Sequence, residues 1–346
     1  MSGRPVVTRV RLAVVALATL LQGCATVSTT PSPPTATGVS AGVSDDTKAL
    51  RRRPPVPPEA ARVRPAPLTF VGDGAFAFVD GRTGAALSVD DVLARLRAHR
   101  VIVVGEQHDQ AAHHEAQRRI VELVGGGGAG VVVGLEMLSW EKQEPLDRFN
   151  RGDVPLDALA DVLDWKKAWG FDFGLYAPIF AAGKAAGARF VALNAPRHLV
   201  RAVREKGVAG LGPDDRARVP ELDLGDDLHR AWFAGVFSSA GHAMKAADLD
   251  GFYRAQVLWD ESMADGAVRA LREGARQVVV IAGAGHVARG RGVPQRVERR
   301  LDGEPVLTFV PVTARADDAE AALARAIADG EGDVLVVPRF EHEVAL

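Results

Sequence analysis

This 346-residue chain contains a single cysteine, Cys24, and only two tyrosines. One thiol excludes an intramolecular disulfide, even in an oxidising compartment. No Gly-x-Ser-x-Gly elbow and no catalytic thiol occur, so a serine or cysteine hydrolase is not expected. The net charge is close to zero, at −2. The chain has no basic helix face and no RNA-type aromatic motif, which argues against nucleic acid as a partner. The composition, 47% hydrophobic and 25% charged, is that of an ordinary globular protein.

The N-terminus has the pattern of an export signal. Three arginines precede the apolar stretch Leu12–Leu21, whose length of about ten residues is too short to span a bilayer and indicates a signal peptide. The stretch leads to Gly23 and Cys24, a lipobox pattern of bacterial lipoproteins. We therefore predict that residues 1–23 are removed and that acyl chains such as palmitate on Cys24 anchor the protein to a membrane. Ala25 stands where an inner-membrane retention signal would have aspartate, which favours the outer membrane.

A proline-rich linker is expected to follow the lipidated cysteine over residues 24–67. It holds nine of the twenty prolines and few large apolar residues. Such a segment cannot bury enough apolar surface to fold. We expect it to act as a stalk between the lipid and the folded body.

The body, residues 68–346, alternates between short apolar strands and helices. The strands are expected at residues 101–104, 131–135, 189–193, 277–282, 306–312 and 333–338. Uniformly apolar strands separated by helices predict an α/β fold, with a mostly parallel sheet and helices on both faces. We expect a single large domain plus a helical region over about residues 226–273. Further helices are predicted over 317–328 and over 109–124, the latter with Asp109 at its N-cap.

Polar side chains follow four of these strands where each strand ends. Glu106 and His108 follow the first strand, Glu136 and Asn194 end the second and third, and His286 follows the fourth. In a parallel sheet the carboxyl ends meet at one edge, and ligand sites of open α/β folds lie outside that edge. The sequence therefore predicts that these side chains converge in one crevice.

Two helices are expected to contribute further side chains to this crevice. His113 is in helical phase with apolar residues and should face inward, whereas His114 should lie at the surface. In the long helical region, Gln256 and Asp260 share one face at a spacing of four residues. A carboxylate in that place can orient a crevice histidine from behind.

Two glutamates and several histidines in one crevice suit more than one chemistry. They bind divalent metals such as Zn, Fe or Mn, and they also act as general acids and bases. The zincin signature His-Glu-x-x-His is missing. The segment Gly283-x-Gly285-x-x-Ala288 fits a dinucleotide fingerprint, but His286 stands inside the turn and the next strand lacks the required acidic end, so nicotinamide is not expected.

Together these motifs resemble the ChaN-like haem-binding lipoproteins of the Tiki/erythromycin-esterase-like superfamily. The matching segments are Gly105-Glu106-Gln107-His108-Asp109 with His113-His114, Gly134-Leu135-Glu136-Met137, Tyr176-Ala177-Pro178-Ile179, Leu193-Asn194-Ala195-Pro196-Arg197, residues 256–264 and Gly283-Ala284-Gly285-His286. The resemblance covers about residues 90–300, and the chain from about residue 305 onward lies outside it.

The resemblance implies haem binding in iron acquisition, on an outer-membrane lipoprotein. It also implies a homodimer with haem near the protomer interface and an outer-membrane haem receptor as a partner. The wider superfamily includes proteins proposed to be metal-dependent hydrolases, so it leaves that alternative function open.

The haem interpretation directs attention to residue types that bind iron. Haem iron takes His, Cys, Met or Tyr as axial ligands, which makes Tyr176 and Tyr253 the candidate ligands. An aromatic stretch before Tyr176 could line a porphyrin pocket. His229 and His242 are weaker candidates, and Arg197 and Arg201 are available for the propionates.

Overall fold

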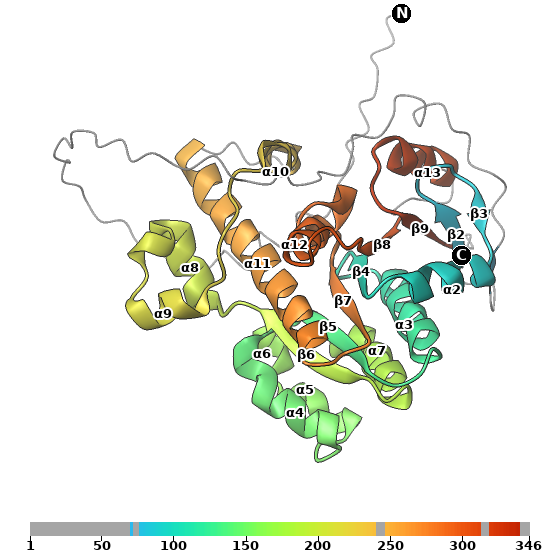
Figure 1. Ribbon diagram of the computed structural model, residues 1–346, viewed down its shortest axis with the longest axis horizontal. Helices are drawn as coiled ribbons and strands as arrows, with labels where there is room; N and C mark the ends of the chain where they lie inside the picture. The colour runs from blue at the N-terminus through green and yellow to red at the C-terminus, as the bar shows by residue number, and fades with distance from the viewer. Residues whose placement is uncertain (1–69, 72–75, 240–245, 313–317, 340–346) are drawn as a thin grey trace, which may run out of the picture.

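The computed structural model describes residues 70–71, 76–239, 246–312 and 318–339 (Figure 1). The predicted signal peptide, Cys24 and the linker to residue 67 lie outside these residues. Among the described helices none is both long and apolar enough to cross a membrane.

One sheet of nine strands organises the described residues, in the order β1-β2-β9-β8-β4-β7-β5-β6, with β3 paired to β2. The strands are β1 Phe70–Val71, β2 Phe76–Asp80, β3 Ala86–Leu87, β4 Val101–Glu106, β5 Val131–Ser139, β6 Arg189–Asn194, β7 Gln277–Gly283, β8 Leu307–Pro311 and β9 Val334–Pro338. The six strands from β9 to β6 run parallel, and β1 to β3 add antiparallel pairs at one end. This confirms the predicted mostly parallel α/β sheet.

Helices cover both faces of the sheet, as expected. One face packs against α2 Val89–Ala98, α3 Ala111–Gly125, α4 Gln143–Arg151, α5 Leu156–Val162, α6 Trp165–Ala168 and α7 Phe173–Ala185. The other packs against α8 Arg197–Lys206, α11 Ala246–Arg272, α12 Val293–Arg300 and α13 Ala319–Ala328. Alternate residues of β4 enter the two cores: Ile102 and Val104 on one face, Val101 and Val103 on the other. Buried on both sides, such a strand has no polar alternation, which is why the sequence shows an uninterrupted apolar run.

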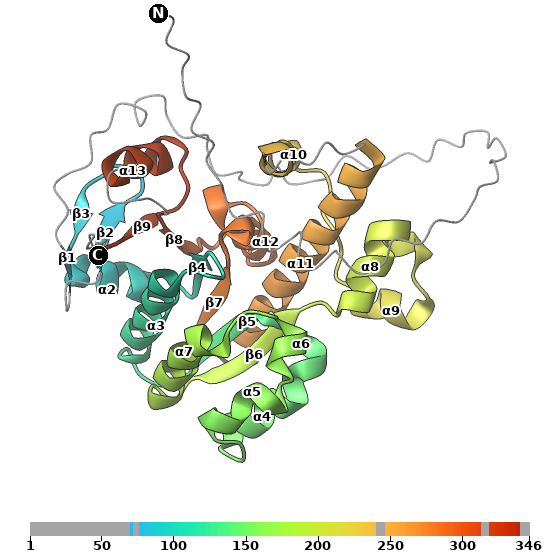
Figure 2. The same cartoon turned by 180° about the vertical axis from the view of Figure 1, so that it is seen from behind.

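Two further helices, α9 Pro213–Arg218 and α10 Asp227–Ser239, precede α11 in the chain. Figures 1 and 2 show α8 and α9 at one end of the molecule and α13 with the β1–β3 strands at the other. The long helical region expected over 226–273 is thus two helices, α10 and α11.

The structure corrects one local expectation, adds three short strands that were not expected and contains two that were. The helix expected from Asp109 begins at Ala111, and Gln110 holds the N-cap position without a side-chain hydrogen bond. The strands β1 to β3 had not been predicted. The strands expected over residues 306–312 and 333–338 are present as β8 and β9, which lie in the sheet between β4 and β2.

Candidate functional site

The carboxyl ends of three adjacent strands, β4, β7 and β5, bring the predicted crevice residues together. Glu136 on β5 accepts a hydrogen bond from the backbone N–H of Gly283 at the end of β7, at 2.5 Å. Its other carboxylate oxygen lies 3.3 Å from Nε2 of His286, which the short helix Ala284–His286 carries. A Cβ atom built on Gly283 would lie 3.1 Å from Nε2 of His108. Only glycine at position 283 therefore leaves space for these side chains to meet.

Glu106 anchors the first of two carboxylate–imidazole pairs. Its fully buried carboxylate accepts a hydrogen bond from Nδ1 of His108 at 2.6 Å, and another from the Tyr176 hydroxyl at 3.0 Å. Burial by itself favours the neutral acid, but the bonds from His108 and His114 outweigh it and lower the pKa of Glu106 to about 2. Conversely, burial opposes the charge on His108, while the bond to Glu106 and the nearby Glu136 charge raise its pKa.

Aromatic rings pack against the His108 imidazole. Trp169 packs edge-on at 4.7 Å between ring centroids, and Phe171 lies at 5.1 Å. The His108 side chain keeps 11% exposure. Its second nitrogen, Nε2, is therefore presented at the crevice by an imidazole whose orientation Glu106 fixes.

The prediction that His114 lies at the surface is wrong. Its side chain is 2% exposed, and its Nδ1 lies 2.7 Å from Glu106. The other ring nitrogen, Nε2, donates to the backbone oxygen of His108 at 3.2 Å. Because the helix begins at Ala111, both neighbouring histidines of its first turn lie under the end of β4.

His113, placed among the crevice candidates by its helical phase, is buried as expected, but it supports the loop after β4. Its Nδ1 accepts a hydrogen bond from the backbone N–H of Gln107 at 2.9 Å. Burial lowers the pKa of His113 to about 4, so the ring is neutral and can accept.

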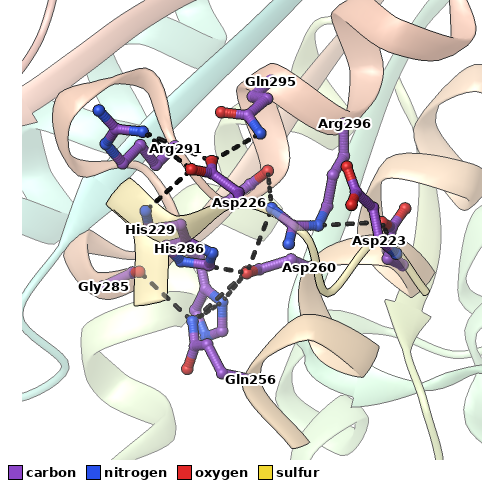
Figure 3. A network of polar contacts seen from close by, with 12 residues as sticks. Asp223, Asp226, His229, Gln256, Asp260, Gly285, His286, Arg291, Gln295 and Arg296 are labelled. Atoms are coloured by element: carbon purple, nitrogen blue, oxygen red, sulfur yellow. Dashed lines mark hydrogen bonds and ion pairs between the residues drawn. The ribbon is translucent and has the colours of Figure 1, made fainter. Parts of the chain in front are cut away.

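His286 forms the second pair and lies between the buried carboxylates of Glu136 and Asp260; Figure 3 shows its contact with Asp260. Its Nδ1 donates to Asp260 at 2.6 Å, and Gln256 lies 3.0 Å from the same nitrogen. Burial disfavours the imidazolium, but the Glu136 charge and the bond to Asp260 outweigh it and raise the pKa of His286 to about 10. The structure thus contains the predicted contact between Asp260 and a crevice histidine.

Behind Asp260 lies a buried network that the sequence did not reveal. The second carboxylate oxygen of Asp260 is 3.8 Å from His229 Nε2 and 3.8 Å from Arg296 Nη1, too far for hydrogen bonds. Burial lowers the pKa of His229 to about 4, so this ring is neutral and the charge pair is that of Asp260 and Arg296. Arg296 on α12 is 1% exposed. Nearby, Asp226 accepts a hydrogen bond from Gln295 at 2.8 Å (Figure 3). The charge pattern of α12 is that of a solvent-exposed helix, so nothing in the sequence distinguishes Arg296 from its exposed neighbours.

Asn194 and the two arginines of α8 take different positions relative to the crevice. Asn194 at the end of β6 donates to the backbone oxygen of Glu136 at 2.9 Å, which ties β6 to the strand that carries the glutamate. Arg197 and Arg201 are exposed on α8, and Arg197 donates to the backbone oxygen of Ala168 at 2.9 Å.

Both tyrosines are buried with their hydroxyl groups engaged. The Tyr176 hydroxyl donates to Glu106 and accepts from Trp169 at 2.9 Å. Burial and the Glu106 charge raise the pKa of Tyr176 far above its ordinary value. The Tyr253 hydroxyl lies 3.3 Å from the backbone oxygen of Asp226, and burial raises its pKa to about 12. His229 is also buried, and His242 lies outside the residues whose side chains the structure describes.

The donor groups of the crevice are arranged as pairs. Across the described ranges no group of three or more His, Cys, Asp or Glu is placed to hold a metal ion. Instead, each crevice glutamate bonds to an imidazole. In this arrangement the oriented imidazoles can donate or accept protons at the crevice.

Comparisons with known proteins identify the family. Residues 92–297 match the sequence profile described as haem-binding uptake, Tiki superfamily, ChaN. Among solved structures, ChaN of Campylobacter jejuni, described for cofacial haem binding, superposes with a TM-score of 0.62 at 18% identity and covers 79% of this chain and 100% of its own. A mutant of the erythromycin esterase EreC in its open conformation gives a TM-score of 0.41 at 11% identity, over 74% of this chain and 95% of its own. No curated protein sequence matches the chain.

Proposed function

Because the chain belongs to the haem-binding uptake family of the Tiki superfamily, we propose that it binds haem and acts in haem or iron acquisition. The observation that carries this proposal is the family match over residues 92–297, which includes β4 to β7 and the whole crevice. The fold shared with Campylobacter jejuni ChaN supports it, since that protein is described for cofacial haem binding.

Of the residues predicted to bind haem, the arginines are placed where they could do so and the tyrosines are not. A tyrosinate ligand must lose its proton and reach the iron, whereas the hydroxyls of Tyr176 and Tyr253 are buried and their pKa values are raised. As placed here, the two tyrosines do not fit as axial ligands. Arg197 and Arg201 are exposed, and guanidinium groups pair well with carboxylates such as haem propionates.

The proposal extends to the location of the protein. We propose that Cys24 is lipidated after removal of residues 1–23 and that the proline-rich linker holds the folded domain beside the outer membrane, where an outer-membrane haem receptor would be its partner. Cells that express the chain should incorporate labelled palmitate into it, and Cys24→Ser should abolish both the label and the membrane association. Equal labelling of the variant would contradict the anchor.

A homodimer is part of the same proposal. Among the described residues, the exposed large apolar side chains are Leu224 and Leu228, at 39% and 53% exposure. They lie close together around the start of α10 and offer an apolar contact for a second copy. Analytical ultracentrifugation with and without haem tests this, and a monomer under both conditions would contradict it.

Haem titration tests the central proposal. Purified protein mixed with micromolar haem should show a saturable Soret shift with a defined stoichiometry. Free haem in the same buffer and an unrelated protein of similar charge serve as controls. A Soret band that never saturates, or that matches the unrelated protein, would overturn haem binding.

A second candidate function is hydrolysis at the crevice, with or without a metal such as Zn, Fe or Mn. The observation that favours it is the partly exposed imidazole of His108, which a buried glutamate orients as in acid–base sites. Chromogenic esters should then be cleaved by the protein and not by a folded His108→Ala variant. Equal rates for both proteins would exclude this role for His108.

A further inference from the structure

Three helices bring one buried polar side chain each to a common place behind the crevice. The side chains are those of His229 on α10, Asp260 on α11 and Arg296 on α12, and each is at most 1% exposed. Among the residues that the structure describes, Nε2 of His229, Oδ2 of Asp260 and Nη2 of Arg296 have no hydrogen-bond partner. Buried polar atoms are nearly always hydrogen-bonded, so three such atoms in one place require an explanation.

Oδ2 of Asp260 is the centre of this cluster (Figure 3). It lies 3.8 Å from Nε2 of His229 and 3.8 Å from Nη1 of Arg296. Two atoms at this separation do not bond directly, but both can lie about 2.8–3.0 Å from one oxygen atom between them. Other bonds hold the side chains apart: Oδ1 of Asp260 accepts from His286 at 2.6 Å, and Nη1 of Arg296 donates to the backbone oxygen of Gly292 at 3.0 Å.

The tautomer of His229 follows from its other ring nitrogen. The Tyr253 hydroxyl donates to the backbone oxygen of Asp226 at 3.3 Å, so its oxygen is an acceptor for Nδ1 of His229 at 3.4 Å. Nδ1 therefore carries the proton of a ring that burial keeps neutral, with a pKa of about 4. Nε2 is then a lone pair that needs a donor, whereas the Asp260 carboxylate that faces it can only accept.

These three groups define what can bind between them. The two acceptors, on His229 and Asp260, require a molecule that donates two hydrogens. The Arg296 guanidinium requires that the same molecule accept one. A cation is disfavoured by the guanidinium and an anion by the carboxylate. One water molecule meets all of these requirements, and buried waters typically make about three hydrogen bonds to polar groups that have no other partner.

We propose that one internal water molecule binds between His229, Asp260 and Arg296. It donates to His229 and Asp260, accepts from Arg296, and completes a hydrogen-bonded line from the crevice imidazole of His286 through Asp260 to α10. His229 is thereby a positioning residue: through the water it holds the carboxylate that orients His286.

A crystal structure of the purified protein, at a resolution that shows ordered water, tests the site directly. One water should lie within hydrogen-bond distance of His229 Nε2, Asp260 Oδ2 and the Arg296 guanidinium. In solution, ¹⁵N NMR of the histidine-labelled protein should show the His229 proton on Nδ1 and a lone pair on Nε2. A structure without this water, or a proton on Nε2 that donates directly to Asp260, would overturn the proposal.

The positioning role has a separate readout in the ¹⁵N signals of His286. His229→Phe keeps a ring and removes the nitrogen that accepts from the water, so the water should be lost and the His286 signals should shift. The matched control Trp232→Phe changes a ring that stacks on His229 at 6.0 Å but brings no change in polar groups near Asp260, so the His286 signals should stay in place.

Circular dichroism verifies that both variants fold, and the wild-type measurements decide the water site even if His229→Phe does not. Unchanged His286 signals in a folded His229→Phe variant would overturn the positioning role. Equal shifts in both variants would overturn it as well, because packing against the His229 ring would then be the cause.

Discussion

His286 should make the stability of this protein fall steeply in alkaline solution. The ordinary histidine pKa of 6.5 is raised to about 10 in the folded protein, where burial opposes the charge but Glu136 and Asp260 stabilise it. A group whose pKa is raised on folding stabilises the protein fully below its unfolded pKa and loses this effect as the pH rises through the folded value. Each pH unit in this window corresponds to about 1.4 kcal/mol, so about 4 kcal/mol of unfolding free energy should be lost between about pH 7 and pH 10.

Guanidinium chloride unfolding at a series of pH values measures this loss. The control is the double variant His286→Gln with Asp260→Asn, which removes the cation together with one buried carboxylate. Lysine and tyrosine titration affects both proteins equally, so the difference between the two pH profiles isolates His286. Parallel profiles between about pH 7 and pH 10 would refute the argument that His286 is a buried imidazolium.

Three further predictions follow from contacts in the crevice. Tyr176→Phe should leave the haem Soret band in place and lower the unfolding free energy by about 1–3 kcal/mol, because the N–H of Trp169 loses its acceptor; a displaced band would show that Tyr176 reaches the iron. Gly283→Ala should shift the NMR signals of His108, because the new Cβ would lie 2.7 Å from its ring carbon, and should cost about 1–3 kcal/mol; an unchanged signal would contradict the contact. Elemental analysis after incubation with Zn²⁺ or Mn²⁺ should find no stoichiometric uptake, because the carboxylates of Glu106 and Glu136 already bond to imidazoles. Tight uptake that Glu106→Ala abolishes would support the metal-dependent alternative.

The parallel strands were predictable because each is buried on both faces. Valine-rich runs such as Val101–Val104 and Val278–Ile281 are typical of buried parallel strands in a chain that alternates strands with helices. The strands β1 and β3 are two residues long and pair as hairpins at the end of the sheet, so they lack both length and periodicity. The start of α3 was misplaced by two residues since Asp109 is a good N-cap by type, while the chain enters the helix through Gln110.

The positions of crevice residues could be predicted where the residue stands at the end of a strand. They could not be predicted where packing between helices and the sheet sets the position. Glu106, Glu136 and His286 follow strands, and the parallel sheet forces their convergence. The position of His114 was predicted wrongly because helical phase gives only the face of the helix on which a residue lies. It does not reveal that Glu106, at the end of β4, contacts the His114 ring and buries it. Arg296 is buried against the carboxylates of Glu261 and Asp260 on α11, a pairing across elements that local sequence does not encode.

The buried charges of the crevice call for a reason other than stability. Paired buried ions often contribute no more than apolar residues of similar size, because the cost of desolvation offsets their attraction. Yet Glu106, Glu136 and Asp260 are all buried beside imidazoles at the edge where α/β folds bind ligands. The shifted pKa values of Glu106, Glu136 and His286 are typical of functional sites. A crevice variant that changes haem binding without unfolding the protein would show that these buried charges serve ligand binding, and unchanged binding in such a variant would contradict it.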